Sequence, residues 1–246
     1  MQLGLTGLTG LVAIAFALTH LYGCRLRFLD KTPRSRWLSL SSGISVAYVF
    51  IHVLPDLSEA QHQVLTSDIA LAFLEHHVYV MALIGMVLFY GLERLAKQSR
   101  QKNLAEGDGD MTEPSVFWLH MASFTLYNLL IGYLLQHREE PGLMSLLLYA
   151  IAMGTHFLVN DYGLRHHHKG LYRKFGRWIL AAAVIAGWAV GSRLEISEAA
   201  VAVLFSLLAG SIILNVLKEE LPEERESRYW TFALGAGGYA AVLLTA

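Results

Sequence analysis

Cysteine is almost absent from this sequence: Cys24 is the one thiol among 246 residues. A single thiol excludes a disulfide within the chain and any metal cluster built on several cysteines. Charge is scarce too, since only 16% of the residues are Asp, Glu, Lys or Arg, against about 25% in an ordinary soluble domain. The 19 basic residues nearly balance the 20 acidic ones, which leaves a net charge of −1. Nucleic acid is therefore not an expected partner.

Long apolar runs take the place of charge. Hydrophobic residues make up 54% of the chain, and the mean hydropathy is +0.43. A membrane-spanning helix needs about 20 mostly apolar residues, and eight stretches qualify: 3–24, 38–60, 69–95, 115–136, 142–164, 176–193, 197–218 and 229–246. None alternates as a barrel strand does, and an isolated segment in lipid satisfies its own backbone only as a helix. The sequence predicts an all-α, polytopic membrane bundle of eight transmembrane helices in one domain, 1–246.

Lys and Arg gather in alternate connections between these runs. They occur in the first, third and fifth connections: Arg25, Arg27, Lys31, Arg34, Arg36, Arg94, Lys97, Arg100, Lys102, Arg165, Lys169, Arg173, Lys174 and Arg177. The positive-inside rule places these connections in the cytoplasm, including a polar loop at 97–113, and both termini outside. We expect an integral protein of a bacterial inner membrane or a plasma membrane.

The stretch Gly43–Asp56 has an echo in Gly210–Glu223. In each, an apolar run begins at glycine, carries an ionisable residue nine positions later (His52 or Glu219), and reaches Leu-Pro followed by a carboxylate. With the loop charges, this pattern predicts inverted repeats of spans 1–3 and 6–8, with spans 4 and 5 between them (3+2+3). Inverted repeats around a central site are typical of secondary transporters.

Several polar residues interrupt the apolar runs: His20, His52, Asp56, Glu75, His76, His77, His120, Asn128, His156, Asn160, Asp161 and Asn215. Such residues are costly in lipid and usually face the protein interior or a water path. His156, Asn160 and Gly163 share one helix face by their spacing. Imidazole and carboxylate groups suit zinc and related divalent cations. They also suit protons, and polar side chains of this kind also act as hydrogen-bonding links between helices.

Three smaller features have two readings each. His52 and Asp56, one turn apart beside Pro55, form either an outer mouth site for a cation or a solvated helix end. His166–His168 reads as a basic cluster facing lipid headgroups in preference to a site that catches a metal. The acidic run Asp108–Asp110 reads as a solvated loop in preference to a cation site.

Three motifs resemble the ZIP (Zrt/Irt-like) family of divalent-metal transporters, in order and spacing. Gly43–Asp56 is similar to the family's second span, which typically ends in His-Leu-Leu-Pro-Glu. Gly85–Glu93 is similar to the end of its third span. Ala209–Glu224 is similar to its seventh span, which reads Ala-Gly, then Glu, then Leu-Pro-Glu. The resemblance covers nearly the whole chain and implies eight spans with both ends outside.

The sequence departs from the family in spans four and five, where ZIP proteins carry their transport site. Span four usually shows His-Asn-x-x-Asp-Gly, and here it reads Tyr127-Asn128-Leu-Leu-Ile131-Gly132. Span five usually shows His-Glu-x-Pro-(His or Glu)-Glu-x-Gly-Asp, and here it reads His156-Phe-Leu-Val-Asn160-Asp161-Tyr-Gly163-Leu164. The usual pair of bridged metal ions does not fit so few acids. A reduced site for one ion remains.

The resemblance implies a carrier of zinc or a related divalent cation that moves spans 1, 4, 5 and 6 against the rest. The metal-binding residues it implies are His156, Asp161, Asn160 and Asn128, with His52 and Asp56 at the mouth. The transport path would include Tyr127, His120, Gly132 and Gly163.

Two other functions stay open. One is a pseudo-transporter that keeps the fold and acts as a metal sensor or scaffold, which the replacement of the usual His and acid by Tyr127 and Ile131 favours. The other is an intramembrane metal hydrolase using His52, His76, His156 and Asp161, although no Ser or Glu stands out as a partner. We expect no enzyme activity and no resident cofactor. The expected partners are a divalent metal ion and the lipid bilayer, with a homodimer left open.

Overall fold

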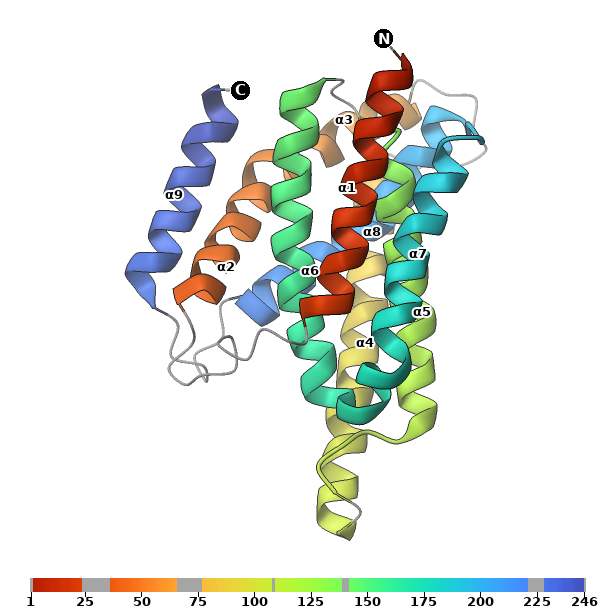
Figure 1. Ribbon diagram of the computed structural model, residues 1–246, viewed down its shortest axis with the longest axis vertical. Coiled ribbons are helices and arrows are strands. Elements are labelled where there is room, and N and C mark those ends of the chain that lie inside the picture. The colour runs from red at the N-terminus through yellow and green to blue at the C-terminus, as the bar shows by residue number, and fades with distance from the viewer. Residues whose placement is uncertain are drawn as a thin grey trace. The chain divides into compact units, whose positions relative to one another are not determined.

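The computed structural model describes residues 2–23, 36–65, 77–107, 109–138, 142–220 and 228–245. Within these ranges every regular element is a helix (Figure 1). The helices are α1 (Gln2–Gly23), α2 (Arg36–Tyr48), α3 (Leu54–Leu65), α4 (His77–Glu106), α5 (Pro114–Leu134), α6 (Leu143–Leu171), α7 (Arg177–Gly191), α8 (Glu198–Glu220) and α9 (Tyr229–Thr245). Two π-helical turns, Val49–Val53 and Tyr172–Gly176, join α2 to α3 and α6 to α7. The all-helical prediction is confirmed.

Six helical stretches in the described residues are long and apolar enough to cross a membrane, which is compatible with an integral membrane protein. The predicted count of eight spans is not confirmed. One reason is that α6 and α7 form a single helical stretch, Leu143–Gly191, of 49 residues. The other is that α9 has only 17 residues.

The 49-residue stretch nevertheless reverses its direction. Along α1, Phe16 packs on Tyr149 and Phe157, and His20, further on, reaches Asp161, so α1 and α6 run in parallel. Against α7 the order is inverted. Gly10 lies against Trp188, while the carbonyl of Leu21 accepts a hydrogen bond from Arg177 (3.4 Å). The reversal is centred on Lys169, the one described non-glycine residue with positive φ (40°), and on the π-helical turn that follows (Figure 1).

The chain divides into two compact units. Unit 1 comprises Met1–Lys31 and Tyr90–Arg193, and unit 2 comprises Thr32–Phe89 and Leu194–Ala246. Unit 1 therefore contains α1, α5, α6, α7 and the second half of α4. Unit 2 contains α2, α3, α8, α9 and the first half of α4.

In unit 1, α1 packs against both α6 and α7, and α5 packs along α7. The core between α1 and α6 is aromatic: the rings of Phe16 and Phe157 meet edge to face, 5.1 Å apart. Small residues let α5 and α7 approach closely. A Cβ on Gly132 would meet the carbonyl of Val184, and a Cβ on Gly187 would meet the carbonyl of Leu129. Backbone contact of this kind is the usual way helices pack in lipid.

Unit 2 contains the same reciprocal glycine contact twice. Between α2 and α9, a Cβ on Gly43 would meet the carbonyl of Phe232, and a Cβ on Gly235 would meet that of Leu40. Between α8 and α4, a Cβ on Gly210 would meet the carbonyl of Ala82, and a Cβ on Gly85 would meet that of Leu207. In each of the four contacts, the carbonyl belongs to the residue three positions before the partner helix's glycine. The crossing of α5 with α7 in unit 1 has the same offset, so the geometry is a general one, and it is the sequence pattern that pairs Gly43 with Gly210.

The helix that begins at Arg36 continues past Pro55 to Leu65, five residues beyond the predicted end of the second span at residue 60. Proline lacks an N–H, and its ring clashes with the carbonyl four residues earlier in a regular helix. The π-helical turn Val49–Val53 comes immediately before it, and there the N–H of Leu54 bonds to the carbonyl of Val49. The wider turn accommodates the proline. The corresponding Pro222 lies outside the described residues.

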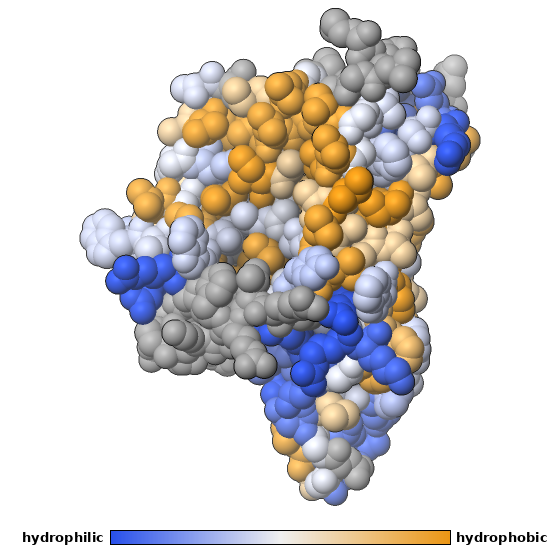
Figure 2. All heavy atoms as spheres, in the orientation of Figure 1, coloured by the Kyte–Doolittle hydropathy of each residue, from blue (hydrophilic) through white to orange (hydrophobic). Residues whose placement is uncertain are grey.

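The polar loop expected at 97–113 is shorter in the structure, because α4 remains helical to Glu106. Its last turns are rich in Lys, Arg and Gln, which are good helix formers and have polar side chains that can be exposed to solvent. Hydrophilic residues gather over this end of α4 and over the turn between α6 and α7 (Figure 2). The connection itself is limited to residues 107–113, of which Asp108 is not described.

Candidate functional site

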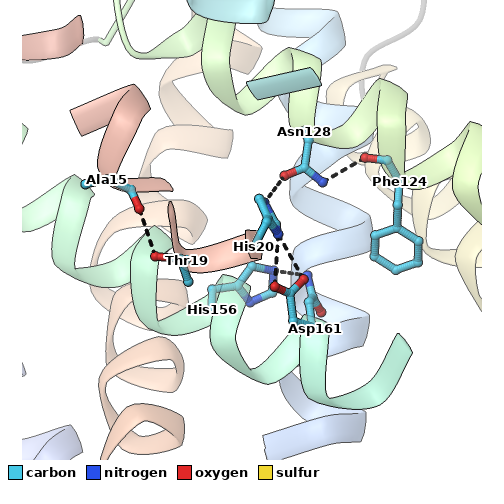
Figure 3. Close-up of polar contacts among 8 residues, drawn as sticks. Ala15, Thr19, His20, Phe124, Asn128, His156 and Asp161 are labelled. Atoms are coloured by element: carbon cyan, nitrogen blue, oxygen red, sulfur yellow. Dashed lines mark hydrogen bonds and ion pairs between the residues drawn. The ribbon is translucent and has the colours of Figure 1, made fainter. Parts of the chain in front are cut away.

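His20 of α1 lies between two side chains from other helices of unit 1 (Figure 3). Its Nδ1 is 2.9 and 3.1 Å from the two carboxylate oxygens of Asp161 on α6. Its Nε2 is 2.8 Å from Oδ1 of Asn128 on α5. One imidazole thus joins three helices.

The hydrogen bonds indicate where the protons of this group are. Asn128 donates from Nδ2 to the carbonyl of Phe124, one turn earlier on α5 (2.8 Å), so its Oδ1 is the atom that faces His20. An amide oxygen only accepts, and therefore Nε2 of His20 carries a hydrogen. A second proton lies between Nδ1 of His20 and Asp161. The pair is consequently either an imidazolium with a carboxylate or a neutral imidazole with a carboxylic acid.

A second hydrogen-bonded group lies on the same part of α6. The hydroxyl of Tyr127 donates to Nε2 of His156 (2.5 Å), and Nδ2 of Asn160 is 3.0 Å from the same nitrogen. Two donors on Nε2 place the imidazole hydrogen on Nδ1. That nitrogen is buried and has no hydrogen-bond partner in the described part of the chain. An N–H left this way inside a protein is costly and marks a place where a ligand or water can bind.

Both groups are shielded from solvent. The exposed fractions are 1% for His20 and Asn128, 2% for Tyr127, His156 and Asp161, and 7% for Asn160. An aromatic ring packs against both: the ring centroid of Phe157 lies 4.6 Å from that of His20 and 6.5 Å from that of His156. In such surroundings a charge needs a partner, which explains why the carboxylate of Asp161 and the ring of His20 are found together.

Four of the six predicted metal-binding residues therefore lie in this region: Asn128, His156, Asn160 and Asp161. The other two, His52 and Asp56, belong to unit 2, where His52 Nε2 is 3.6 Å from Asp56 Oδ2 and both side chains are partly exposed. Of the predicted path residues, Tyr127 contacts His156 and Gly163 is buried in α6, whereas Gly132 packs against α7. Glu75 and His76 lie outside the described residues.

Another histidine group lies near the beginning of α5 and the end of α6. Nε2 of His120 donates to the carbonyl of Leu92 (2.7 Å), and Nε2 of His168 is 3.1 Å from Nδ1 of His120. Nδ1 of His168 is in turn 2.5 Å from the hydroxyl of Thr112. Since Leu92 can only accept, neutral rings give one direction of donation, from Thr112 through His168 and His120 to Leu92.

This group changes two sequence interpretations. His167 and His168 are buried, with exposed fractions of 8% and 1%, so they do not face lipid headgroups; only His166 of the three is exposed. His167 instead lies 3.4 Å from Glu93 on α4. His120, expected on the transport path, belongs to this end group and lies two turns from Asn128.

Asp110 fastens the loop to the same end of α6. It pairs with Arg100 on α4 and with Nζ of Lys169 (2.7 Å). The hydrogen bond from Arg100, and then that from Lys169, hold the pKa of Asp110 well below its usual range. A lowered folded pKa stabilises the protein above the pKa of the unfolded carboxyl, and this contribution is lost only as pH falls through the lower value. At neutral pH the loop is therefore attached.

Among the described residues, no three His, Cys, Asp or Glu side chains gather into a group able to hold a metal ion. The groups in the His20 and His156 clusters that could act as metal ligands are a carboxylate, amide oxygens and imidazoles, and these suit a divalent cation chemically. They are engaged with one another in this arrangement. An entering polar or cationic group would therefore have to replace some of these hydrogen bonds.

His20 is the residue that sequence reasoning left out of the site. It was recognised as a polar interruption of the first apolar run, but no spacing rule connects α1 to α5 and α6. Its contacts span 141 residues to Asp161 and 108 residues to Asn128. The available signal was the cost of placing an ionisable residue there, which predicts a partner without naming it.

Comparison with known proteins found no matching family model, curated protein or solved structure.

Proposed function

We propose that this chain is a membrane carrier of the ZIP-like type, which moves zinc or a related divalent cation through a reduced site on α5 and α6. The observation that carries the proposal is the buried group of Asn128, His156, Asn160 and Asp161, held within helices otherwise apolar enough to cross a membrane. Buried polar groups at such positions are costly and mark transport paths. The proposed role is that of a carrier, not of a catalyst.

Two features of the fold support this proposal. The division into units follows the grouping that the ZIP resemblance implies, with spans 1, 4, 5 and 6 in unit 1. The glycine crossings of α2 with α9 and of α8 with α4 share one geometry, which is compatible with the internal duplication of spans 2–3 and 7–8 that the sequence pattern predicts. Duplicated halves are the usual basis of alternating access in secondary transporters.

The direct test is uptake of zinc, iron or manganese into proteoliposomes that contain the purified protein. We expect saturable uptake that falls at least tenfold in His156→Ala and in Asn128→Ala. Thr155→Ala is the matched control, because Thr155 neighbours His156 on α6 but its hydroxyl bonds only to the carbonyls of Ile151 and Ala152. Uptake that survives the combined loss of His156 and Asn128 would contradict a metal site on α5 and α6.

A second candidate, the non-transporting sensor or scaffold, is favoured by one contact. The hydroxyl of Tyr127 binds the nitrogen of His156 that would otherwise face a cation. In this case the native protein takes up no metal, whereas Tyr127→His combined with Ile131→Asp, which restores the family's usual residues, creates uptake. Transport by the native protein would eliminate this candidate.

A further inference from the structure

His20 is held at both ring nitrogens by the oxygens that a cation would need. Nδ1 is within 3.1 Å of both carboxylate oxygens of Asp161, and Nε2 is 2.8 Å from the amide oxygen of Asn128. The amide nitrogen Nδ2 of Asn128 already donates to the carbonyl of Phe124 within α5. Both carboxylate oxygens of Asp161 and the amide oxygen of Asn128 therefore face His20, and an ion that approaches them from this side meets the imidazole first.

His20 is also poorly suited to bind the metal itself in this arrangement. A histidine ligand gives a metal the lone pair of an unprotonated ring nitrogen. Here Nε2 carries a hydrogen toward Asn128, and Nδ1 faces the carboxylate of Asp161, with which it shares a proton. The imidazole and the shared proton therefore link the two oxygen groups, which is the role that a bound cation would take.

The element that carries His20 differs from those that carry the oxygens. His20 lies three residues before the last residue of α1, whereas Asn128 and Asp161 lie within α5 and α6. Because one side chain makes all of these contacts, movement of His20 away from α5 and α6 would release both oxygen groups together. The His20 ring also packs against the ring of Phe157, with 4.6 Å between the ring centroids, so it has an apolar contact besides its hydrogen bonds.

From these contacts we infer that His20 is a built-in occupant of the cation site, and that a divalent cation binds Asn128 and Asp161 only by displacing it. The inference rests on the proposed function, because it concerns the same site. It makes His20 a residue that sets affinity and selectivity: an ion that binds weakly to oxygen ligands cannot replace the imidazole. It also explains how a carboxylate is kept in the membrane interior while no metal is bound.

The test measures Zn²⁺ binding to the purified full-length protein in detergent by titration calorimetry. We expect His20→Ala to bind Zn²⁺ on the order of tenfold more tightly than the native protein, because two hydrogen-bonded groups no longer have to be separated first. His20→Gln can still donate to one of the oxygens and should be intermediate. If the alanine variant does not fold, the comparison of His20→Gln with the native protein decides.

Two controls assign the gain to the site. His137→Ala removes another histidine of unit 1, which bonds to the carbonyl of Gly191 away from the site, and should leave Zn²⁺ affinity unchanged. Asp161→Asn combined with His20→Ala should lose the gain. Weaker binding in His20→Ala would show that His20 is a ligand, and unchanged or undetectable binding in both proteins would equally overturn the inference. A protein without uptake whose His20 variants bind more tightly would refute the carrier and leave this inference intact.

Discussion

At the scale of single residues, the contact between His20 and Asp161 determines the character of the site. Both side chains are almost completely buried, and each is the partner that makes the burial of the other tolerable. Removing one member of a buried pair leaves an uncompensated polar group, whereas removing both together is much less costly. The sequence showed that each residue needed a partner, but the pairing appears only in the structure.

This pair gives a prediction about stability. We expect His20→Ala and Asp161→Ala each to lower the free energy of unfolding by about 3 kcal/mol, and the double substitution to cost clearly less than the sum. The measurement is a double-mutant cycle on the purified protein, unfolded reversibly in mixed micelles. Strictly additive losses would mean that the two side chains do not interact.

At the scale of helices, glycines decide which pairs come close. Gly43, Gly85, Gly210 and Gly235 each lie against a backbone carbonyl of the partner helix, as do Gly132 and Gly187 in unit 1. The sequence motif that begins at Gly43 and again at Gly210 predicts an inverted repeat. The structure gives the physical reason for glycine at its first position, which is close helix packing.

Substitutions to alanine should separate contact glycines from the others. We expect Gly43→Ala and Gly210→Ala to destabilise the protein by about 1–3 kcal/mol each, because a methyl group would overlap a backbone carbonyl of the partner helix and force the two helices apart. Gly91 and Gly237 are helical and have no atom within 4 Å of an added Cβ. Alanine there should be neutral or stabilising by up to about 1 kcal/mol. Thermal unfolding in one detergent compares all four, and equal effects would contradict the packing assignment.

At the scale of the whole molecule, the chain forms two compact units built from interleaved segments. The first half of α4 belongs to unit 2 and its second half to unit 1, so this helix is a continuous connection between them. The polar groups joined by His20 and His156 lie in unit 1, and the glycine crossings of α2 with α9 and of α8 with α4 lie in unit 2.

The proposed membrane orientation gives a prediction for the complete chain. In a Cys24→Ser background, a cysteine at Gln101, an exposed residue near the end of α4, should react with a membrane-impermeant maleimide only after the cells are opened. A cysteine at Ser197, exposed just before α8, should react in intact cells. The basis is the excess of Lys and Arg on the side of Gln101. Labelling of both positions from the same side would contradict the predicted topology.

The sequence by itself determined the all-helical class and the positions of the long apolar stretches, because a backbone in lipid must satisfy its own hydrogen bonds and apolar length is readable along the chain. The single helical stretch Leu143–Gly191 and the extension of α4 to Glu106 appear only in the structure. Spacing also placed His156 and Asn160 on one helix face, and the family resemblance added Asp161 to the predicted site. The tertiary structure decided what no spacing rule can supply: that His20 lies between Asn128 and Asp161, that His120 and His168 form a separate group, and that His52 belongs to the other unit. Contacts between helices depend on which faces meet, and that depends on the packing of the whole chain.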